Sequence, residues 1–315
     1  MAARRSGAAL LLGALLAGCA VGGGLPPSAP IAPAREGELT AADGSGLATS
    51  IWQADAPQAI LLALHGYGDY GPSTFSAAGV FWAGQGITTI AYDQRGFGRN
   101  PSRGIWPGAE ALIADLKGVV AQLRARHPCL PLIVLGHSMG GGVVLAAGPD
   151  LARGALADGM VLAAPAIWGG AELNPFHRLA AWGAAAMVPE RRFTGEGVVR
   201  IQASDNIDAL RALGRDPLYL SPPSAREIFG LVRVVDRAEA AADEAALPTL
   251  LLTGEKDQIL PRRAVRRVFD RLPGSNRTIE YTDGWHLLFR DLQAERVWSD
   301  VVQWILARPG PACDS

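Results

Sequence analysis

The chain has 315 residues, of which 49% are hydrophobic and 19% are charged, and its formal net charge is −1. This length suits one large domain with a sizeable core and an insertion. The near-neutral balance has neither the basic surplus of a nucleic-acid-binding protein nor an acidic tail, so no nucleic-acid partner is expected.

The first eighteen residues have the pattern of a secretion signal. Arg4 and Arg5 precede an apolar run at residues 8–16, which is too short to span a bilayer. Residues 16–19 read Leu-Ala-Gly-Cys and closely resemble the bacterial lipobox. The resemblance implies cleavage before Cys19, lipidation of its thiol and anchoring in the bacterial cell envelope, at the outer membrane if the cell has two. A simple secretory peptide that is cleaved nearby is the alternative.

Residues 19–36 are expected to form a tether, because prolines among small residues cannot build a core and favour an extended chain. Cys129 and Cys313 are the cysteines that follow. In an oxidising compartment they could form a disulfide that ties the C-terminal tail to the sheet, or they could stay as free thiols. The sequence leaves both possibilities open.

Apolar runs along the body predict strands, and several runs are wholly apolar, as in a parallel sheet that is covered on both faces. The predicted strands span residues 47–53, 59–64, 87–92, 131–135, 160–164, 249–253 and 278–281. Helices are expected at residues 75–83, 110–126, 261–272 and 292–306, with another that begins near residue 139. This alternation predicts an α/β fold, in which a mostly parallel sheet is flanked by helices.

The alternation stops after residue 165 and resumes near residue 247. The intervening stretch has no good apolar strand run, and helices are expected at residues 173–188, 206–213 and 224–242. We therefore expect a helical cap at residues 166–246, inserted between two parts of an α/β core at residues 37–165 and 247–315. Residues 1–18 would be the signal peptide.

The most informative motif is Gly136-His137-Ser138-Met139-Gly140, which fits the pattern G-x-S-x-G. A buried strand is expected before it and a helix after it, so the chain must turn sharply and expose the Ser138 hydroxyl. Glycine fits at both ends because a Cβ there would collide across the turn. The helix N-terminus offers N–H groups to a developing negative charge. An ordinary glycine-rich turn is the alternative.

A serine nucleophile needs a base to take its proton and an acid to orient that base. His286 lies in a loop just beyond the last predicted strand, where it could reach Ser138. Asp257 follows the strand at residues 249–253, which gives the chain order Ser, Asp, His. Glu255 is the rival for the acid. Asp93 has arginines beside it, and we expect it to pin its own loop.

The oxyanion of an acyl-transfer intermediate needs two N–H donors. Met139 follows the nucleophile and supplies one, and Tyr67 is our choice for the other. Tyr67 belongs to the loop His65-Gly66-Tyr67-Gly68, so His65 and Gly66 are also expected at the substrate. An ordinary structural turn is the alternative. Aromatic residues of the cap could line an acyl pocket or form the core of the cap itself: Trp168, Phe176 and Trp182.

Together with the segment at residues 93–98, Asp-Gln-Arg-Gly-Phe-Gly, these motifs resemble the α/β-hydrolase superfamily. The similar branch is the monoacylglycerol lipase and lysophospholipase group, which is also filed with the S33-type serine aminopeptidases. The resemblance covers roughly residues 40–308. It implies an eight-stranded, mostly parallel sheet and a helical lid, with neither a metal nor an organic cofactor. The lipoprotein signal and the loop at residues 67–70, Tyr-Gly-Asp-Tyr, depart from the usual pattern.

The expected activity is hydrolysis of carboxylic esters with lipid-like or small acyl groups, of the monoacylglycerol or lysophospholipid type. An aminopeptidase-type amide hydrolase is the alternative, and it would need a cap carboxylate to hold a substrate amine. The cap offers Glu172, Glu190, Glu196 and Glu227. A surface lipoprotein that only binds its ligand is a further possibility. Acyl length, head group and oligomeric state stay open.

Overall fold

A computed structural model describes residues 35–168, 174–193, 201–308 and 310. The predicted signal peptide at residues 1–18, the lipidation site Cys19, nearly all of the tether, and Cys313 lie outside these residues. No helix in the described ranges is long and apolar enough to cross a membrane.

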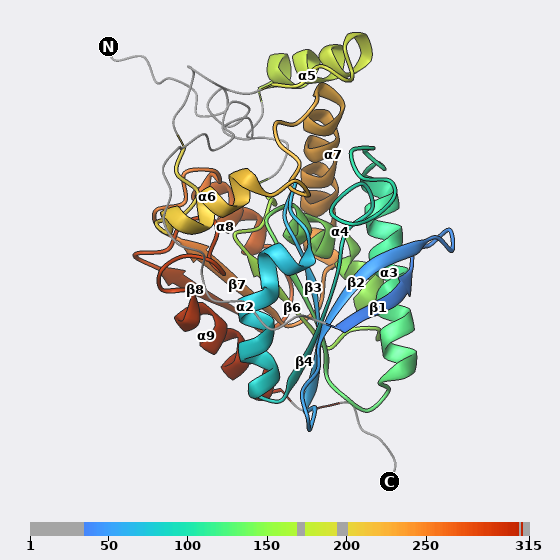
Figure 1. The fold of residues 1–315 in the computed structure, drawn as a ribbon, viewed down its shortest axis with the longest axis vertical. Helices are drawn as coiled ribbons and strands as arrows, with labels where there is room; N and C mark the ends of the chain where they lie inside the picture. The colour runs from blue at the N-terminus through green and yellow to red at the C-terminus, as the bar shows by residue number, and fades with distance from the viewer. Residues whose placement is uncertain (1–34, 169–173, 194–200, 309, 311–315) are drawn as a thin grey trace.

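An eight-stranded sheet runs through the centre of the molecule, in the order β1-β2-β4-β3-β5-β6-β7-β8 (Figure 1). β1 and β2 pair antiparallel, as do β2 and β4, and the other neighbours are parallel. The strands are β1 (Arg35–Thr40), β2 (Gly46–Trp52), β3 (Ala59–Leu64), β4 (Ile87–Tyr92), β5 (Leu132–His137), β6 (Gly159–Ala163), β7 (Thr249–Gly254) and β8 (Asn276–Tyr281). This topology confirms the predicted α/β-hydrolase fold.

Apolar runs located seven of these strands to within a few residues, but β1 was missed. β1 reads Arg-Glu-Gly-Glu-Leu-Thr, which has no apolar run. It forms because its backbone completes a hairpin with β2, with Leu39 opposite Leu47 and both side chains buried. Backbone pairing at a sheet edge needs no hydrophobic alternation, so the sequence carries little sign of it.

Helices cover the sheet on both faces. α2 (Gly71–Gly84) packs against α9 (Ala294–Leu306), and α3 (Ala109–Arg126) packs against α4 (Met139–Arg153). α2 begins four residues earlier than predicted because Pro72 in its first turn is compatible with a helix start. α8 (Arg262–Phe269) connects β7 to β8.

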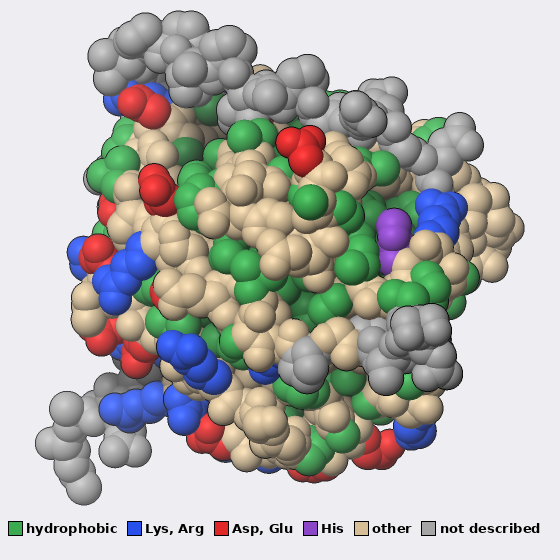
Figure 2. Space-filling view, turned by 90° about the horizontal axis from the view of Figure 1, so that it is seen from below, with side chains coloured by type: hydrophobic (Ala, Val, Ile, Leu, Met, Phe, Trp, Pro, Cys, Tyr) green, Lys and Arg blue, Asp and Glu red, His purple; other side chains and the backbone are tan. Residues whose placement is uncertain are grey.

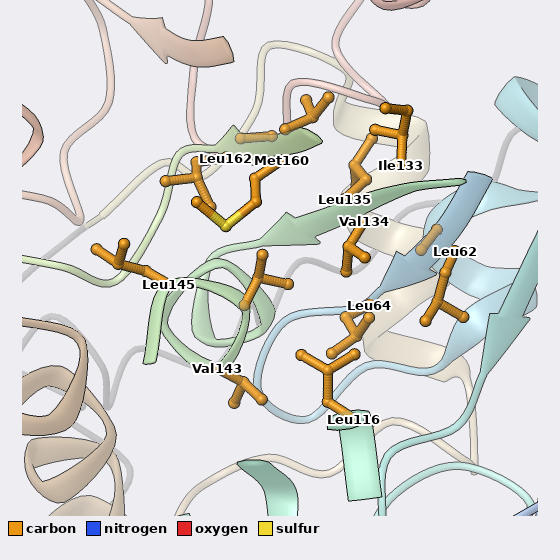
Figure 3. Close-up of a cluster of buried hydrophobic side chains, with 14 of the residues drawn as sticks. Leu62, Leu64, Leu116, Ile133, Val134, Leu135, Val143, Leu145, Met160 and Leu162 are labelled. Carbon is orange, nitrogen blue, oxygen red and sulfur yellow. The ribbon is translucent and has the colours of Figure 1, made fainter. Parts of the chain in front are cut away.

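The core is formed by the central strands and the helices packed on them. Every residue of β3, β4, β5 and β6 is buried. Figure 3 shows Leu64 of β3 near Leu116 of α3, and Met160 of β6 on the side of Leu145 of α4. Burial of this apolar surface stabilises the packed sheet. It therefore holds the carboxyl ends of neighbouring parallel strands side by side.

In the described part of the chain between β6 and β7, the α-helices lie within a few residues of the predicted positions: α5 (Pro175–Met187), α6 (Ile207–Arg215) and α7 (Ala225–Ala241). α7 starts with a capping box between Ser224 and Glu227 and packs along α4. Gly230 lets α7 approach the Trp106 ring, since a Cβ there would lie 2.1 Å from the ring. In α5, which lies at the top of Figure 1, Ala181 is the buried residue.

Cys129 is disulfide-bonded. Its partner lies outside the described residues, so the pairing with Cys313 stays a prediction. Gly310, three positions before Cys313, lies beside Cys129: a Cβ on Gly310 would lie 3.5 Å from the Cys129 carbonyl oxygen. The end of the described chain therefore runs where such a disulfide requires it.

Several charged side chains on the surface pair with opposite charges. Examples are Lys117 with Asp150 and Arg178 with Asp236. Figure 2 shows acidic and basic side chains interspersed over one face of the molecule. Such exposed pairs contribute about 0–1 kcal/mol each, so stability comes mainly from the core.

The core predicts a clear difference between two leucines. Leu62 of β3 is fully buried, whereas Leu179 of α5 is 61% exposed. Leu62→Ala should lower the free energy of unfolding by about 2–5 kcal/mol, because it leaves a cavity between sheet and helices. Leu179→Ala should change it by less than about 0.5 kcal/mol. Urea denaturation followed by circular dichroism measures both, and equal losses would contradict this account of the core.

Candidate active site

Ser138 lies at the sharp turn between β5 and α4, with φ 52° and ψ −116°. This left-handed conformation is strained for a residue with a side chain. The turn is held by hydrogen bonds in which the Ser138 N–H donates to the Ala163 carbonyl and its own carbonyl accepts from the Ala166 N–H, at 3.0 and 2.9 Å. The half-buried side chain is left pointing out of the turn at the carboxyl edge of the sheet.

Glycines make room for the turn, as the motif predicted. A Cβ on Gly136 would lie 2.4 Å from the Gly140 carbonyl oxygen, and a Cβ on Gly140 would lie 2.6 Å from the carbonyl oxygen of Leu64 in β3. Gly66 faces the nucleophile, since its Cβ would lie 3.2 Å from the Cβ of Ser138. Larger residues would therefore push the nucleophile, α4 and β3 apart.

The structure brings Ser138, His286 and Asp257 into one hydrogen-bonded chain. His286 Nε2 lies 3.0 Å from Ser138 Oγ, and His286 Nδ1 lies 2.9 Å from Asp257 Oδ2. An ionised carboxylate only accepts, so Nδ1 carries the proton and Nε2 is free to accept from the serine hydroxyl. The rival acid, Glu255, is exposed and takes no part in this chain.

Asp257 is held as a charged group. Its side chain is 3% exposed, and its Oδ1 accepts from the N–H groups of Ile259 and Leu260 at 2.7 and 3.0 Å. Burial alone would raise its pKa. The charge and hydrogen bond of His286, together with the two N–H donors, outweigh burial and lower the pKa of the carboxyl. The carboxylate therefore stays ionised while it orients the imidazole.

His286 lies in the loop between β8 and α9, residues 282–293, which we call the catalytic loop. His137 fixes the backbone of this loop, a contact that the sequence did not indicate. Its Nε2–H donates to the His286 carbonyl oxygen at 3.0 Å. Burial, with a smaller contribution from the charge of His286, lowers the pKa of His137 to about 3, so its ring stays neutral. His137 thus holds the backbone of His286 in place.

Tyr67 and Met139 lie on either side of the nucleophile, at the end of β3 and the start of α4. In the described part of the chain, neither backbone N–H donates to a protein acceptor. Gly68, with φ 77°, brings the Tyr67 loop against the cap: its carbonyl accepts from the Leu220 N–H at 2.8 Å. The assignment of both N–H groups to an oxyanion hole stays a prediction.

His65 does not face a substrate site, contrary to our expectation. It is fully buried, Nδ1 donates to the Gly66 carbonyl at 2.8 Å, and Nε2 accepts from the Gln94 N–H at 2.8 Å. Burial lowers the pKa of His65 to about 4. Because both ring nitrogens bond backbone groups, His65 shapes the turn instead of contacting a ligand.

The interpretation of Asp93 agrees with its contacts. Its carboxylate accepts from the Gly71 N–H at 3.0 Å and from the Arg99 N–H and Nε at 2.8 Å each. Arg95 turns the other way and pairs with Asp115 of α3. The loop after β4 is thus pinned by buried charge and does not contribute an acid to the site.

The three cap aromatics predicted at the substrate are in different environments. Trp168 is 4% exposed and follows β6 closely. Phe176 and Trp182 are 79% and 55% exposed, and they line a shallow surface groove on α5 with Leu179 and Met187. Both side chains therefore belong to an exposed apolar groove, and their role in lining an acyl pocket stays a prediction.

Metal ligands do not cluster within the ranges that the structure describes: no group of three His, Cys, Asp or Glu side chains there could hold a metal ion. Proton transfer and charge stabilisation can both be supplied by the side chains and N–H groups described above.

A strained serine between a parallel strand and a helix, bonded to a histidine and an aspartate that follow in the order Asp, His, defines a serine hydrolase of the α/β-hydrolase class. Residues 55–293 match the family model described as serine aminopeptidase, S33. The match spans more than half of the chain, so the chain belongs to this family.

The alignments with individual relatives cover most of each relative's length. The chain is 28% identical to a monoacylglycerol lipase of Mycolicibacterium smegmatis over 84% of this chain and 94% of the relative. It is 24% identical to the human monoglyceride lipase, over 87% and 91% of the two chains. A solved monoglyceride lipase of Saccharomyces cerevisiae superposes with a TM-score of 0.74 at 19% identity, covering 89% and 98% of the chains, which supports the fold.

The buried histidines predict how stability depends on pH. His65 has a folded-state pKa of about 4, against an ordinary value of 6.5, so the unfolded chain binds more protons as pH falls from 6.5 to 4. The free energy of unfolding should decrease in that window, by on the order of 3 kcal/mol from His65. Denaturation at several pH values should give a shallower slope for His65→Gln than for the wild type.

The control for this slope is Leu179→Ala, which changes an exposed side chain of α5 that does not titrate. Its slope should equal that of the wild type. If all three proteins had the same slope, His65 would not be the neutral buried group described here.

Proposed function

We propose that this protein hydrolyses carboxylic esters with lipid-like or small acyl groups, through an acyl-enzyme on Ser138. The observation that carries the proposal is the unbroken chain Ser138–His286–Asp257 at 3.0 and 2.9 Å, built on a serine that the turn exposes. Family membership and ester-cleaving relatives over most of the chain agree with it.

In the proposed reaction, Ser138 Oγ attacks the ester carbonyl carbon while His286 Nε2 takes the hydroxyl proton. The carbonyl oxygen becomes an oxyanion that accepts from the N–H groups of Tyr67 and Met139. The C–O bond to the alcohol breaks, and His286 gives its proton to the leaving oxygen. Asp257 stabilises the imidazolium throughout.

Deacylation repeats these steps with water. His286 removes a proton from a water molecule, whose oxygen attacks the acyl carbon of the Ser138 ester. The tetrahedral intermediate collapses, the acid leaves, and the proton returns to Ser138. Atoms and charge therefore balance with water as the only co-substrate.

The aminopeptidase alternative has less support. Among the described glutamates of the cap, Glu227 is 3% exposed, but its Oε2 already accepts from the Ser224 N–H at 2.7 Å in the capping box. Glu190 is exposed and pairs with Arg226. Glu172 and Glu196 lie outside the described residues. No described cap carboxylate is thus both buried and available for a substrate amine.

The experiment is hydrolysis of p-nitrophenyl esters from C2 to C16 by protein lacking residues 1–19. Ser138→Ala should reduce kcat by on the order of a thousandfold or more, because the nucleophile is gone, while the free energy of unfolding changes little. The chain-length optimum then separates a small-ester esterase from a lipase-like enzyme.

Activity that survives in Ser138→Ala would contradict the assignment of the nucleophile. A folded wild type that cleaves no ester but cleaves aminoacyl amides would replace ester hydrolysis by the alternative.

We also propose that Cys19 carries a lipid that anchors the protein to the bacterial envelope. The support is the lipobox-like sequence before it and the proline-rich stretch that leads to β1. When the full chain is expressed in a bacterium, the wild type should sediment with membranes and incorporate labelled palmitate. Cys19→Ser should lose the label and appear in the soluble fraction. Equal labelling of the two proteins would overturn the proposal.

A further inference from the structure

Three consecutive backbone groups hold the catalytic histidine in place. The Trp285 N–H donates to Asp291 Oδ2 at 2.8 Å, the His286 carbonyl accepts from His137 at 3.0 Å, and the Leu287 N–H donates to the Ala203 carbonyl at 2.9 Å. The His137 contact joins the loop to the end of β5. The Trp285 contact joins it to Asp291, and the Leu287 contact joins it to the cap.

Asp291 joins the catalytic loop to the cap through its two carboxylate oxygens. While Oδ2 accepts from Trp285, Oδ1 accepts from the Ser204 hydroxyl at 2.6 Å. Asp291 is 3% exposed and Ser204 is fully buried, so water does not compete for these bonds. One side chain therefore fixes the residue before His286 and the cap segment before α6.

The same cap segment, residues 203–206, makes further bonds to the loop around Asp291. Asn206 Nδ2 donates to the Arg290 carbonyl at 2.8 Å, and Asp205 Oδ1 accepts from the Leu292 N–H at 2.9 Å. The cap and the catalytic loop are thus one hydrogen-bonded unit on this side of the site, although about 80 residues separate them in the chain.

Keeping a carboxylate in this place costs free energy. Burial raises the pKa of Asp291 to about 6, and the bonds from Ser204 and Trp285 act in the opposite direction. Filling space alone would not call for such a group, because an apolar side chain of similar size could do so without desolvating a charge. The carboxylate suits a position that has hydrogen-bond partners on two sides, Trp285 and Ser204.

We propose that Asp291 is a positioning residue for the reaction: by holding Trp285 and Ser204 together, it places the His286 ring where it reaches Ser138 and Asp257 at once. Asp291 touches neither substrate nor the reacting atoms. It acts through the backbone of the catalytic loop, and the cap segment shares in setting the geometry. This inference rests on the proposed function only in that it concerns the same nucleophile.

The expected effects follow from the sensitivity of proton transfer to distance, since a displacement of about 1 Å can cost on the order of a hundredfold in rate. Asp291→Ala removes both contacts and should lower kcat by about 10- to 100-fold, with KM within about twofold of the wild type. Ser204→Ala removes one contact and should lower kcat by a smaller factor, about threefold or more.

Asp291→Asn is the conservative rescue. Its amide oxygen can accept from Trp285 while its NH₂ group donates to the Ser204 hydroxyl, so both contacts survive without the charge. Its kcat should lie within about threefold of the wild-type value. Because Asn also fills the space of Asp, Asp291→Leu separates positioning from space filling: it keeps the volume but accepts neither bond, and its kcat should fall as far as that of Asp291→Ala.

The control is Asp115→Ala. Asp115 is 1% exposed and also accepts from a backbone N–H and a side chain, those of Ala42 and Arg95, but it lies on α3 away from the catalytic loop. Its loss should lower the melting temperature to a degree comparable with Asp291→Ala and leave kcat unchanged. The comparison separates an effect on stability from an effect on the position of His286.

The measurement is kcat and KM on the p-nitrophenyl ester that the wild type prefers, with kcat expressed per site titrated by a fluorophosphonate, and the rate of fluorophosphonate labelling as a second readout. Wild type that is not labelled refutes the proposed function itself. Labelled wild type, with Asp291→Ala equal to it in kcat and labelling rate, refutes the positioning role alone. If Asp291→Ala does not fold, an unchanged kcat in Ser204→Ala refutes that role.

Discussion

The left-handed backbone of Ser138 is the constraint on which the rest of the site depends. Holding a residue with a side chain at φ 52° costs about 1–3 kcal/mol, so contacts in the surrounding structure must offset this cost. The bond that the Ser138 N–H donates to Ala163, the bond that its carbonyl accepts from Ala166, and the missing Cβ atoms at Gly136 and Gly140 do so together. These contacts tie the nucleophile to β6 and β3, which sit where the buried core puts them. The core thus fixes the reactive hydroxyl as well as the fold.

Two neutral histidine rings and one charged aspartate have different roles around the Ser138 hydroxyl. His65 and His137 are buried and stay neutral, so each can bond backbone groups without bringing a charge next to His286. Asp257 stays ionised because it has three hydrogen-bond donors around it. The imidazole of His286 can therefore gain and lose a proton in a setting whose other members do not titrate near neutral pH.

The sequence predicted features that depend on local pattern and chain order. Wholly apolar runs located the parallel strands, and the ends of those strands predicted which of five histidines could approach Ser138. What it missed depends on contacts between distant residues. β1 forms by pairing with β2, and His137 and Asp291 act through the loop around His286. The exposure of Phe176 and Trp182 could not be predicted either, because apolar composition alone does not tell which side chains of a cap helix are buried.

The cap divides into parts with different freedom to change. α7 lies against α4 and Trp106 so tightly that Gly230 has no room for a Cβ, and the segment before α6 is bonded to the catalytic loop. α5 has one buried residue, Ala181, and its other side chains are half-buried or exposed. Over evolutionary time, substitutions should accumulate on α5 at little cost in folding. The outer surface of the cap can diverge between lineages while the geometry around Ser138 stays the same.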